Sequence, residues 1–360
     1  MFLKNLQLTN FRNFKSAKID LNQRVNIFVG KNAQGKTNII EAINLFATGR
    51  SFRNSEYRDL IEWKNLESHI KSESIFDCGS DELHIHLSLE SKNFFKNSKK
   101  TTSGGFKGVG SVLFAPEETL LFKESPSVRR KYLDTFISQL DFGYRTLIRN
   151  YERVVAHRNK ILQDMEIRTS KKESELLVWD EKLSQFGSQI IITRARWIDK
   201  INDFLPIKYD GIAKQDGRCK ILYKPHDDEK NILSELLRRR EEEYARRTTL
   251  VGPHRDDILV EINDADLASF GSQGQHRSVV LAIKMSEVEI IQKTLGEIPI
   301  LLLDDVASEL DRDRNKSFFD FLTELKGQIF ITATDSDSIN LWNEKDVTKF
   351  EVINGNVVTL

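Results

Sequence analysis

Residues 30–37 have the sequence Gly-Lys-Asn-Ala-Gln-Gly-Lys-Thr, which fits the phosphate-binding pattern G-x-x-x-x-G-K-[ST]. The apolar run from Val25 to Val29 comes directly before it and predicts a buried strand. Apolar residues at helical spacing come directly after it and predict a helix over residues 38–47. A strand, a glycine-rich loop and a helix in this order predict a site for a nucleoside triphosphate, rather than a plain turn that caps a helix.

The residues of this loop have distinct expected roles at a bound triphosphate. Two glycines allow the backbone to curl so that successive N–H groups point at phosphate oxygens, beside the positive end of the helix dipole. Lys36 is expected to reach the β- and γ-phosphates as the catalytic cation, and Thr37 to offer its hydroxyl to Mg²⁺. The sequence therefore predicts ATP and Mg²⁺ as cofactors. The expected ATP-binding residues of the loop are Gly30, Lys31, Asn32, Ala33, Gln34, Gly35, Lys36 and Thr37.

The composition is that of a globular protein. The 360 residues include 54 Lys plus Arg and 54 Asp plus Glu, so the formal net charge is zero and any basic surface for nucleic acid has to be local. The two cysteines, Cys78 and Cys219, lie far apart and predict neither a metal site nor a structural disulfide. Because no signal peptide and no apolar run of membrane length is evident, we expect a soluble, cytoplasmic protein.

The pattern of elements changes twice along the chain. Short strands surround the loop, long helices follow, and strand signals then return. The long helices are expected over Ser127 to Leu140, Tyr144 to Met165 and Glu173 to Phe204. A short polar segment joins the second to the third, which favours an antiparallel pair. We therefore expect an α/β phosphate-loop domain formed by residues 1–115 and 206–360, with a helical arm or lid domain inserted at residues 116–205.

Several other segments carry structural expectations. The alternating segments Leu3 to Leu8 and Ser16 to Leu21 predict an antiparallel edge beside the strand that enters the phosphate loop. The basic segment 92–107 predicts a flexible hairpin tip or loop, which is either solvated or in contact with nucleic-acid phosphates. The segment from Leu236 to Arg247 is highly charged and predicts a solvated helix with ion pairs four residues apart.

A second apolar run, from Pro299 to Leu303, ends in the carboxylates Asp304 and Asp305. Such a run predicts a central strand buried on both faces, and its ending fits the Walker B pattern. Asp304 is expected to hold Mg²⁺ directly or through water, and Asp305 to orient or deprotonate the attacking water. A strand that ends in a helix-capping Asp is the alternative, but the phosphate loop in the same chain favours the catalytic assignment.

The stretch Gly271-Ser272-Gln273-Gly274-Gln275 precedes a predicted helix from Ser278 to about Thr294. It resembles the S-x-G-Q signature loop of ABC-type ATPases. Ser272, Gln275 and the backbone at Gly274 would form a second anion cradle at a helix N-terminus. The resemblance implies that this cradle faces the γ-phosphate held by a partner subunit. A plain loop that caps a helix is the alternative.

Residues 307–311, Ala-Ser-Glu-Leu-Asp, follow the Walker B carboxylates and resemble the D-loop of the same superfamily. The resemblance places Asp311 at the ATP site, across a dimer interface. A histidine that senses the γ-phosphate usually follows the next strand, which is predicted over Gln328 to Thr332. This chain has Thr-Ala-Thr-Asp at 332–335, so Thr334 is the candidate substitute.

Stretches outside these motifs resemble the RecF family, bacterial recombination-repair ATPases related to SMC-type heads. The most specific are residues 126–134, Pro-Ser-Val-Arg-Arg-Lys-Tyr-Leu-Asp, and residues 252–257, Gly-Pro-His-Arg-Asp-Asp. Residues 8–14, 49–53 and 114–117 also match, so the resemblance runs nearly from end to end.

The RecF resemblance implies an ABC-ATPase fold of the SMC-head type and an ATP-dependent homodimer around two nucleotides. It implies binding to double-stranded DNA and to junctions of single- and double-stranded DNA, in repair and replication restart after DNA damage. RecR and RecO are the implied partners, and the loading of RecA on single-stranded DNA is the implied task. It also implies weak, DNA-stimulated ATP hydrolysis that acts as a switch. Slow hydrolysis is expected as well because Asp305 is shorter than the Glu that many relatives have at this position.

Three arginines have two interpretations each. The resemblance implies that Arg12 touches nucleotide, as an N-terminal arginine does in SMC-type heads, whereas an ion pair with an acidic residue is the alternative. Arg129 and Arg130 fit either DNA contacts or an ion-paired hinge. No residue is therefore assigned to DNA binding from the sequence.

Other functions fit parts of the sequence. An ABC-type transporter motor would need a membrane partner, and usually a Gln-containing loop and a switch histidine, neither of which is evident. An ATPase-nuclease of the overcoming-lysogenisation type would need a nuclease domain, for which about fifty residues after Asp305 are too few. An interaction protein that binds ATP without hydrolysing it differs in class and would show no turnover.

Overall fold

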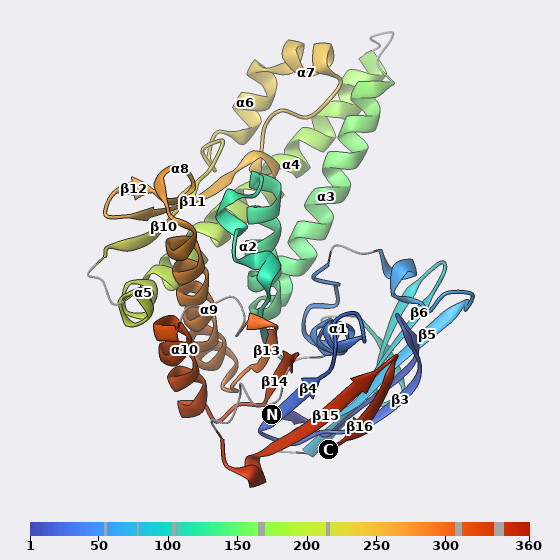
Figure 1. The fold of residues 1–360 in the computed structure, drawn as a ribbon. Coiled ribbons are helices and arrows are strands. Elements are labelled where there is room, and N and C mark those ends of the chain that lie inside the picture. The colour runs from blue at the N-terminus through green and yellow to red at the C-terminus, as the bar shows by residue number, and fades with distance from the viewer. Residues whose placement is uncertain are drawn as a thin grey trace. The chain divides into compact units, whose positions relative to one another are not determined.

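The computed structural model describes residues 1–53, 56–77, 79–102, 106, 109–164, 170–213, 217–306, 312–334 and 342–360 (Figure 1). Its contacts divide the chain into two compact units. The first unit comprises residues 1–119, 211–214 and 280–360, and the second comprises residues 120–210 and 215–279. The second unit begins near the expected start of the helical insertion, but it continues far beyond residue 205. The reason is packing: Asn202 exchanges two hydrogen bonds with the backbone of Ile221, which binds the returning strands to the helices.

The first unit contains a six-stranded, mainly parallel sheet. Its strands, in spatial order, are β16 (Asn356–Thr359), β15 (Val347–Ile353), β4 (Val25–Val29), β14 (Ile329–Ala333), β13 (Ile300–Asp304) and β9 (Ser111–Phe114). β4 lies between β14 and β15 and is parallel to both, and β13 is parallel to its two neighbours. Every residue of β4, β13 and β14 is buried, which confirms the central strands expected from their apolar sequences.

A second, antiparallel sheet belongs to the same unit. Its strands are β3 (Phe14–Asp20), β2 (Asn5–Phe11), β5 (Glu67–Phe76), β6 (Gly79–Ser88), β7 (Lys92–Lys96) and β8 (Lys99–Thr101), and β1 (Phe2–Leu3) pairs with β5. β2 and β3 pair as expected, but they do not border the strand that enters the phosphate loop. That expectation was wrong because both sides of β4 are already taken by parallel strands.

The basic segment 92–107 was expected to be a flexible hairpin tip or loop. Its first part is instead the regular hairpin of β7 and β8, in which Phe94 is buried, Lys92 and Lys96 are half-buried on the same face, and Lys99 and Lys100 are exposed. Phe94 lies opposite the buried Ile85 of β6, and this apolar cross-strand contact favours a regular strand despite the neighbouring lysines. Residues 103–105, 107 and 108 lie outside the described part of the chain.

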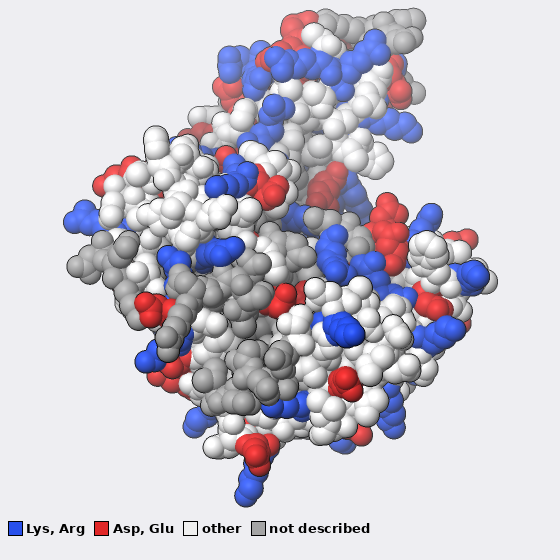
Figure 2. Space-filling model, in the orientation of Figure 1, with Lys and Arg blue, Asp and Glu red and all other residues white. Residues whose placement is uncertain are grey.

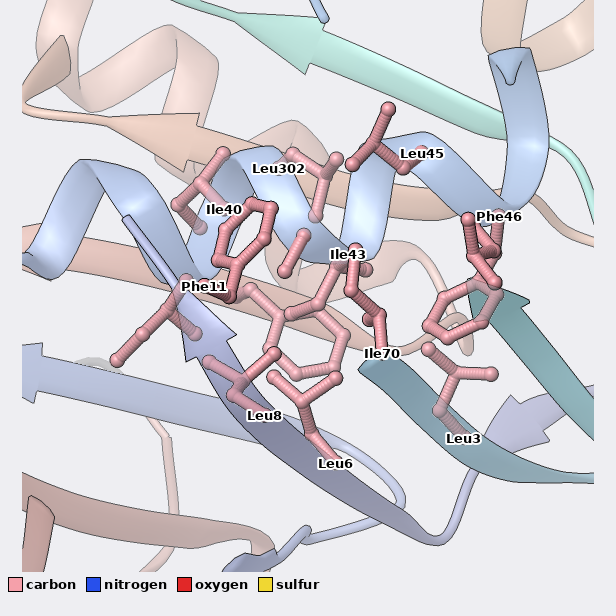
Figure 3. Packing of buried hydrophobic residues seen from close by; sticks show 14 of the residues in the cluster. Leu3, Leu6, Leu8, Phe11, Ile40, Ile43, Leu45, Phe46, Ile70 and Leu302 are labelled. Atoms are coloured by element: carbon pink, nitrogen blue, oxygen red, sulfur yellow. The ribbon is translucent and has the colours of Figure 1, made fainter. Parts of the chain in front are cut away.

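Helix α1 (Lys36–Thr48) lies between the two sheets of the first unit, and almost all of its residues are buried. Figure 3 shows Ile40, Ile43 and Phe46 of α1 among side chains of the antiparallel sheet, with Leu302 of β13 on the parallel sheet. On the parallel sheet, α10 (Arg312–Glu324) packs Phe318 against Phe114 of β9 with ring centroids 4.8 Å apart. The core of this unit therefore fixes the helix that begins at the phosphate loop.

Long helices dominate the second unit. They are α2 (Pro126–Leu140), α3 (Phe142–Gln163), α4 (Ser170–Asn202) and α5 (Leu205–Ala213), followed by a sheet of β10 (Cys219–Lys224), β11 (Asp257–Ile262) and β12 (Ala265–Asp266). The shorter helices are α6 (Ile232–Arg238), α7 (Arg240–Arg246) and α8 (Leu267–Phe270), and α9 (Gln273–Leu295) begins in this unit. No described helix is both long enough and apolar enough to cross a membrane.

Helices α3 and α4 form the expected antiparallel pair (Figure 1). Arg158 contacts Asp180, Tyr151 lies against Gly187, and Tyr144 contacts Arg194. Each step of seven residues back along α3 is matched by seven residues forward along α4, so the two helices run in opposite directions. A seven-residue step is two helical turns, which keeps these contacts on one seam.

The charged segment from Leu236 to Arg247 is not the single solvated helix that its sequence predicted. It forms the end of α6 and the whole of α7, and Figure 2 shows basic and acidic side chains intermixed around these helices. Glu243 is fully buried, because Arg158 donates to both of its carboxylate oxygens. Arg158 is itself fully buried and also donates to Asp180 at 2.7 Å. Burial of a charge requires such pairing, so Glu243 belongs to the packed interior, whereas Glu241 is exposed and Glu242 forms the expected ion pair with Arg246, four residues on.

Candidate nucleotide-binding site

The phosphate loop connects the end of β4 to the start of α1. Gly30 has φ +154°, and a Cβ atom there would lie 2.5 Å from the carbonyl oxygen of Val352 on β15. Gly35 has φ +114° and forms the left-handed cap of α1. Both positions therefore require glycine, the first because of close backbone approach and the second because of its conformation.

Three asparagines hold this loop from outside. Asn13, in the turn between β2 and β3, donates to the carbonyl oxygen of Gln34 at 2.8 Å, and Asn38 donates to Asn13 at 2.8 Å. The amide of Asn354 donates to the side chain of Gln34 at 2.6 Å. No sequence pattern predicted a role for Asn13, because its position beside the loop depends on strands distant in sequence.

Lys36 is buried and folds back over the loop. Its ammonium donates to the carbonyl oxygens of Gly30 at 2.6 Å and Lys31 at 3.0 Å. Burial lowers the pKa of Lys36, and the negative charges of Asp305 and Asp304 oppose that shift. The amine therefore lies within the curl of the loop, with two acidic side chains nearby.

Asp304 joins the Walker B strand to the phosphate loop. The hydroxyl of Thr37 donates to Oδ1 of Asp304 at 3.0 Å, and the hydroxyl of Thr332 on β14 donates to the same oxygen at 2.7 Å. Asp304 is only 5 % exposed. The carboxylate is thus held in one orientation by two neighbouring elements, at the carboxyl ends of adjacent parallel strands.

Asp305 has an unusual backbone conformation. Its φ is +50°, which is uncommon for a residue other than glycine, and its amide donates to the hydroxyl of Thr332 at 3.0 Å. This conformation turns the chain sharply directly after Asp304, and the Asp305 side chain lines the same cavity as Lys36.

A cavity of about 350 Å³ lies over these groups. Its lining residues are Asn32, Ala33, Gly35, Lys36, Thr37, Asn38, Arg53, Asp304, Asp305 and Thr332. Seven of these come from the predicted loop and Walker B residues, and Asn38, Arg53 and Thr332 were not predicted. Arg53 donates to the side chain of Asn38 at 3.0 Å, which holds a guanidinium beside the cavity. The only sequence signal for Arg53 was its place in a family stretch without a stated role.

Arg12 adopts the ion-pair alternative. Its guanidinium donates twice to Glu41 of α1, at 2.7 and 2.8 Å, and once to the carbonyl oxygen of Asp59 at 3.0 Å. Arg12 is not among the residues that line the cavity described above. A contact of Arg12 with nucleotide therefore remains a prediction.

The signature residues lie in the second unit, at the start of α9. The amide of Gln275 donates to the hydroxyl of Ser272 at 3.2 Å, and the amide of Ser272 donates to the side chain of Gln275 at 2.9 Å. This reciprocal pair is a capping box, so the helix-cap alternative describes the local structure. Ser272 is nevertheless exposed, which leaves its hydroxyl and the helix N-terminus accessible.

The remaining predicted positions have mixed outcomes. Thr334 is exposed, directly after β14. Asp311 lies outside the described residues.

Arg129 is buried and donates to both carboxylate oxygens of Asp257 at 2.8 Å, and Arg130 donates to the carbonyl oxygen of Asp256 at 2.6 Å. Arg129 therefore forms the ion pair of the second interpretation within the second unit, whereas the hydrogen bond of Arg130 is to the backbone.

The parallel sheet, the curled loop and the Thr37–Asp304 hydrogen bond together define a phosphate-loop ATPase. The sequence matches the family described as RecF/RecN/SMC N terminal domain over residues 2–352. Two relatives are called DNA replication and repair protein RecF. The one from Clostridium tetani is 36% identical to this chain and the one from Geotalea uraniireducens is 37% identical. Each alignment covers 99% of this chain and 100% of the relative. The chain therefore belongs to the RecF family, within the ABC-type ATPases.

Solved structures agree with this assignment. Two structures of the recombination mediator protein RecF in the RecFOR pathway, as RecF-ATP and as RecF-ATPrS, are 32% and 31% identical to this chain. Each has a TM-score of 0.90, and each alignment covers 100% of this chain and 97% or 98% of the other. An Smc head domain from Pyrococcus furiosus, 17% identical with a TM-score of 0.55 and covering 100% and 96%, shares the fold alone. The expected SMC-head-like ATPase fold is confirmed.

Proposed function

We propose that this chain is an ATP-dependent DNA-binding protein of recombinational repair, in which ATP closes a dimer on DNA and hydrolysis opens it. The observation that carries the proposal is the meeting of Lys36, Thr37 and Asp304 at one cavity, where a triphosphate and its metal ion would be held. The role in repair is supported by relatives that are named for DNA replication and repair.

The oxygens of Thr37 and Asp304 fit Mg²⁺. Their Oγ1 and Oδ1 atoms lie 3.0 Å apart, and two neighbouring ligands of an octahedral Mg²⁺, each about 2.1 Å from the ion, lie about 3 Å apart. Hydroxyl and carboxylate oxygens are also the donors that this ion prefers. When bound, Mg²⁺ would neutralise charge on the β- and γ-phosphates.

The other residues of the cavity have complementary tasks. Lys36 would exchange the carbonyl oxygens of its own loop for oxygens of the β- and γ-phosphates. Arg53 would add a second positive charge at the edge of the cavity. Asp305 would orient the attacking water, and its fixed backbone supports a fixed position of the carboxylate. Slow hydrolysis is expected because this carboxylate has a short side chain.

The second half of each composite site is assigned to Ser272, Gly274 and Gln275 of another copy of the chain. The support is an exposed hydroxyl at the N-terminus of a 23-residue helix, which favours an anion. A γ-phosphate bound from both sides stabilises the closed dimer, because a ligand that contacts only one state shifts the population towards it. Hydrolysis removes that bridge and releases the dimer.

DNA would be held mainly through its phosphates, by local groups of Lys and Arg on a chain whose net charge is zero. Double-stranded DNA and junctions of single- and double-stranded DNA are the proposed substrates. RecO and RecR are the proposed partners in loading RecA, on the strength of relatives from the RecFOR pathway. The proposed location is the cytoplasm.

Sedimentation of the purified chain tests this proposal. We expect a shift from monomer to dimer when ATP and Mg²⁺ are present, and a further complex with duplex DNA that weakens as salt rises. An unchanged sedimentation coefficient with ATP, together with no salt-sensitive DNA binding, would reject the ATP-gated clamp. Turnover measured with and without DNA separates the ATPase from a protein that only binds ATP.

A further inference from the structure

Three histidines and a glutamate gather on the outer face of the antiparallel sheet in the first unit. Glu67 and His69 lie on β5, and His84 and His86 lie on β6. His69 and His86 are directly opposite in the strand register. Alternation along the strands sends Ser68, Ile70, Ile85 and Leu87 to the core and leaves these four side chains on the other face.

The ligand atoms of three of these residues converge on one point. Glu67 Oε2 lies 3.0 Å from His86 Nε2, and Glu67 Oε1 lies 3.8 Å from His69 Nε2. One ligand atom from each of the three residues lies within 4.8 Å of the others. Four ligands about 2.1 Å from a tetrahedral ion are about 3.4 Å apart, so rotamer adjustments of about 1 Å would complete the geometry.

His84 supports this cluster from its side. Its Nε2 lies 3.0 Å from Nδ1 of His69, and the two rings stack with centroids 5.2 Å apart. When His69 donates its Nδ1 proton to His84, the lone pair of its Nε2 faces Glu67, where a cation would bind. A hydrogen bond of this kind on the outer nitrogen is the usual way in which proteins orient a metal-binding histidine.

The protonation states also suit a metal ion. Burial, with the repulsion of neighbouring cations, lowers the pKa of His84 to about 4 and lowers the pKa of His69. The hydrogen bond from His86 lowers the pKa of Glu67. The lowered pKa of His69 favours its neutral imidazole and the lowered pKa of Glu67 favours its carboxylate, which are the forms that bind a metal ion. Lys71 lies opposite His84 in the strand register, and its positive charge would repel a bound cation.

We propose that Glu67, His69 and His86 bind one divalent transition-metal ion of the zinc class, with His84 orienting His69 and solvent at the fourth position. Two imidazoles and one carboxylate are ligands of Zn²⁺ and its neighbours rather than of Mg²⁺, which favours oxygen alone. The site is separate from the nucleotide cavity, whose lining shares no residue with it. A bound ion would link β5 to β6 across the face of the sheet.

The test uses the full chain, stripped with a chelator and titrated with Zn²⁺ alone by calorimetry, without nucleotide. We expect one ion per chain, and a loss of affinity of at least tenfold in Glu67→Gln and in His86→Ala. Co²⁺ should give the intense visible bands of four-coordination in the unchanged chain and lose them in both variants. His157→Ala is the matched control, because this histidine also stacks on a neighbouring ring, that of Trp179, but belongs to no such cluster.

Three outcomes would overturn the proposal. The first is the absence of Zn²⁺ binding to the unchanged chain, which would leave the cluster as cross-strand stacking only. The second is Zn²⁺ binding that both variants retain, and the third is binding that Cys78→Ser abolishes instead. Burial raises the pKa of Cys219 to about 12, so that thiol stays protonated and does not compete. Glu67 is well exposed, so Glu67→Gln should fold normally, which circular dichroism can check.

Discussion

Arg12 and Glu41 form a two-point ion pair in which the Glu41 side chain is fully buried and the Arg12 side chain is 18 % exposed. Glu41 lies one turn into α1, and Arg12 lies in the turn between β2 and β3 with φ +54°. The pair therefore links the antiparallel sheet to the helix that carries Lys36 and Thr37. The ion pair orients the nucleotide site from outside the cavity.

Arg12→Ala should lower the free energy of unfolding of the first unit by about 3 kcal/mol, because it leaves a buried carboxylate without its main partner. Urea unfolding followed by circular dichroism measures the change. Arg12→Lys should recover only part of the loss, since an amine cannot make the two-point contact. If Arg12→Ala instead weakens ATP binding with no change in stability, the contact with nucleotide is the correct assignment for Arg12.

Asp304→Asn should lower Mg²⁺-dependent ATP hydrolysis at least tenfold, because an amide oxygen carries no charge to hold the ion beside Thr37. The Mg²⁺ concentration that gives half-maximal hydrolysis should rise as well. Asp320→Asn, at an exposed position of α10, is the control and should behave as the unchanged chain. Equal hydrolysis in the Asp304 variant and the control would remove Asp304 from the metal site.

Gly30→Ala should reduce ATP affinity at least tenfold. Its Cβ would lie 2.5 Å from the carbonyl oxygen of Val352, so the loop has to move away from β15. Fluorescent ATP analogues report the affinity. Gly211→Ala is a matched control, because a Cβ at Gly211 meets nothing within 4 Å. Wild-type affinity in Gly30→Ala would mean that the curl of the loop tolerates a side chain.

Ser272→Arg should abolish ATP-dependent dimerisation without changing ATP binding by the single chain, because the bulky cation blocks the second anion cradle. Lys36→Arg should reduce both, since it alters the first cradle. Analytical ultracentrifugation with and without ATP distinguishes the two. Ser234→Arg introduces the same side chain at an exposed position of α6 and should dimerise normally. Normal ATP-dependent dimerisation of Ser272→Arg would contradict the composite site.

Stability of the second unit should fall as pH falls below about 6.5. Burial lowers the pKa of His254 to about 4, and its Nδ1 accepts from Tyr151 at 2.7 Å. The unfolded chain takes up a proton through pH 6.5 while the folded chain takes it up only near 4, so protons favour unfolding in that window by up to about 3 kcal/mol.

His254→Gln is the variant that isolates this effect. Its urea midpoint should be lower than that of the unchanged chain at neutral pH, because the hydrogen bonds of His254 are altered. Its decline between about pH 6.5 and 4 should be shallower, because one titrating group is gone. Parallel curves for the two proteins would show that His254 carries no pH dependence.

The nucleotide site was predictable where the signal is local. The strand Val25–Val29, the loop and the start of α1 follow from neighbouring residues, and so does the Walker B strand that ends at Asp304. Thr332 and Arg53 were missed because their place at the cavity depends on strand pairing and on a loop turned by long-range contacts. Neither carries a pattern that distinguishes it from an ordinary Thr or Arg.

The fold shows the same division between local and long-range information. Helix periodicity located α2, α3 and α4 to within a few residues. It could not show that β2 and β3 belong to a separate sheet, because alternation marks a strand but not its neighbours. The prediction of a solvated, ion-paired segment at α7 holds for Glu242 and Arg246 but not for Glu243, because the burial of Glu243 depends on Arg158, 85 positions away.

The contacts of the phosphate loop with residues late in the chain have a consequence for biosynthesis. The loop residue Gln34 accepts a hydrogen bond from the amide of Asn354, 320 positions later in the chain, and Gly30 packs against the carbonyl of Val352. A ribosome makes the loop early and these contacts late. We therefore expect tight nucleotide binding by a nascent chain only after β15 has emerged and paired with β4.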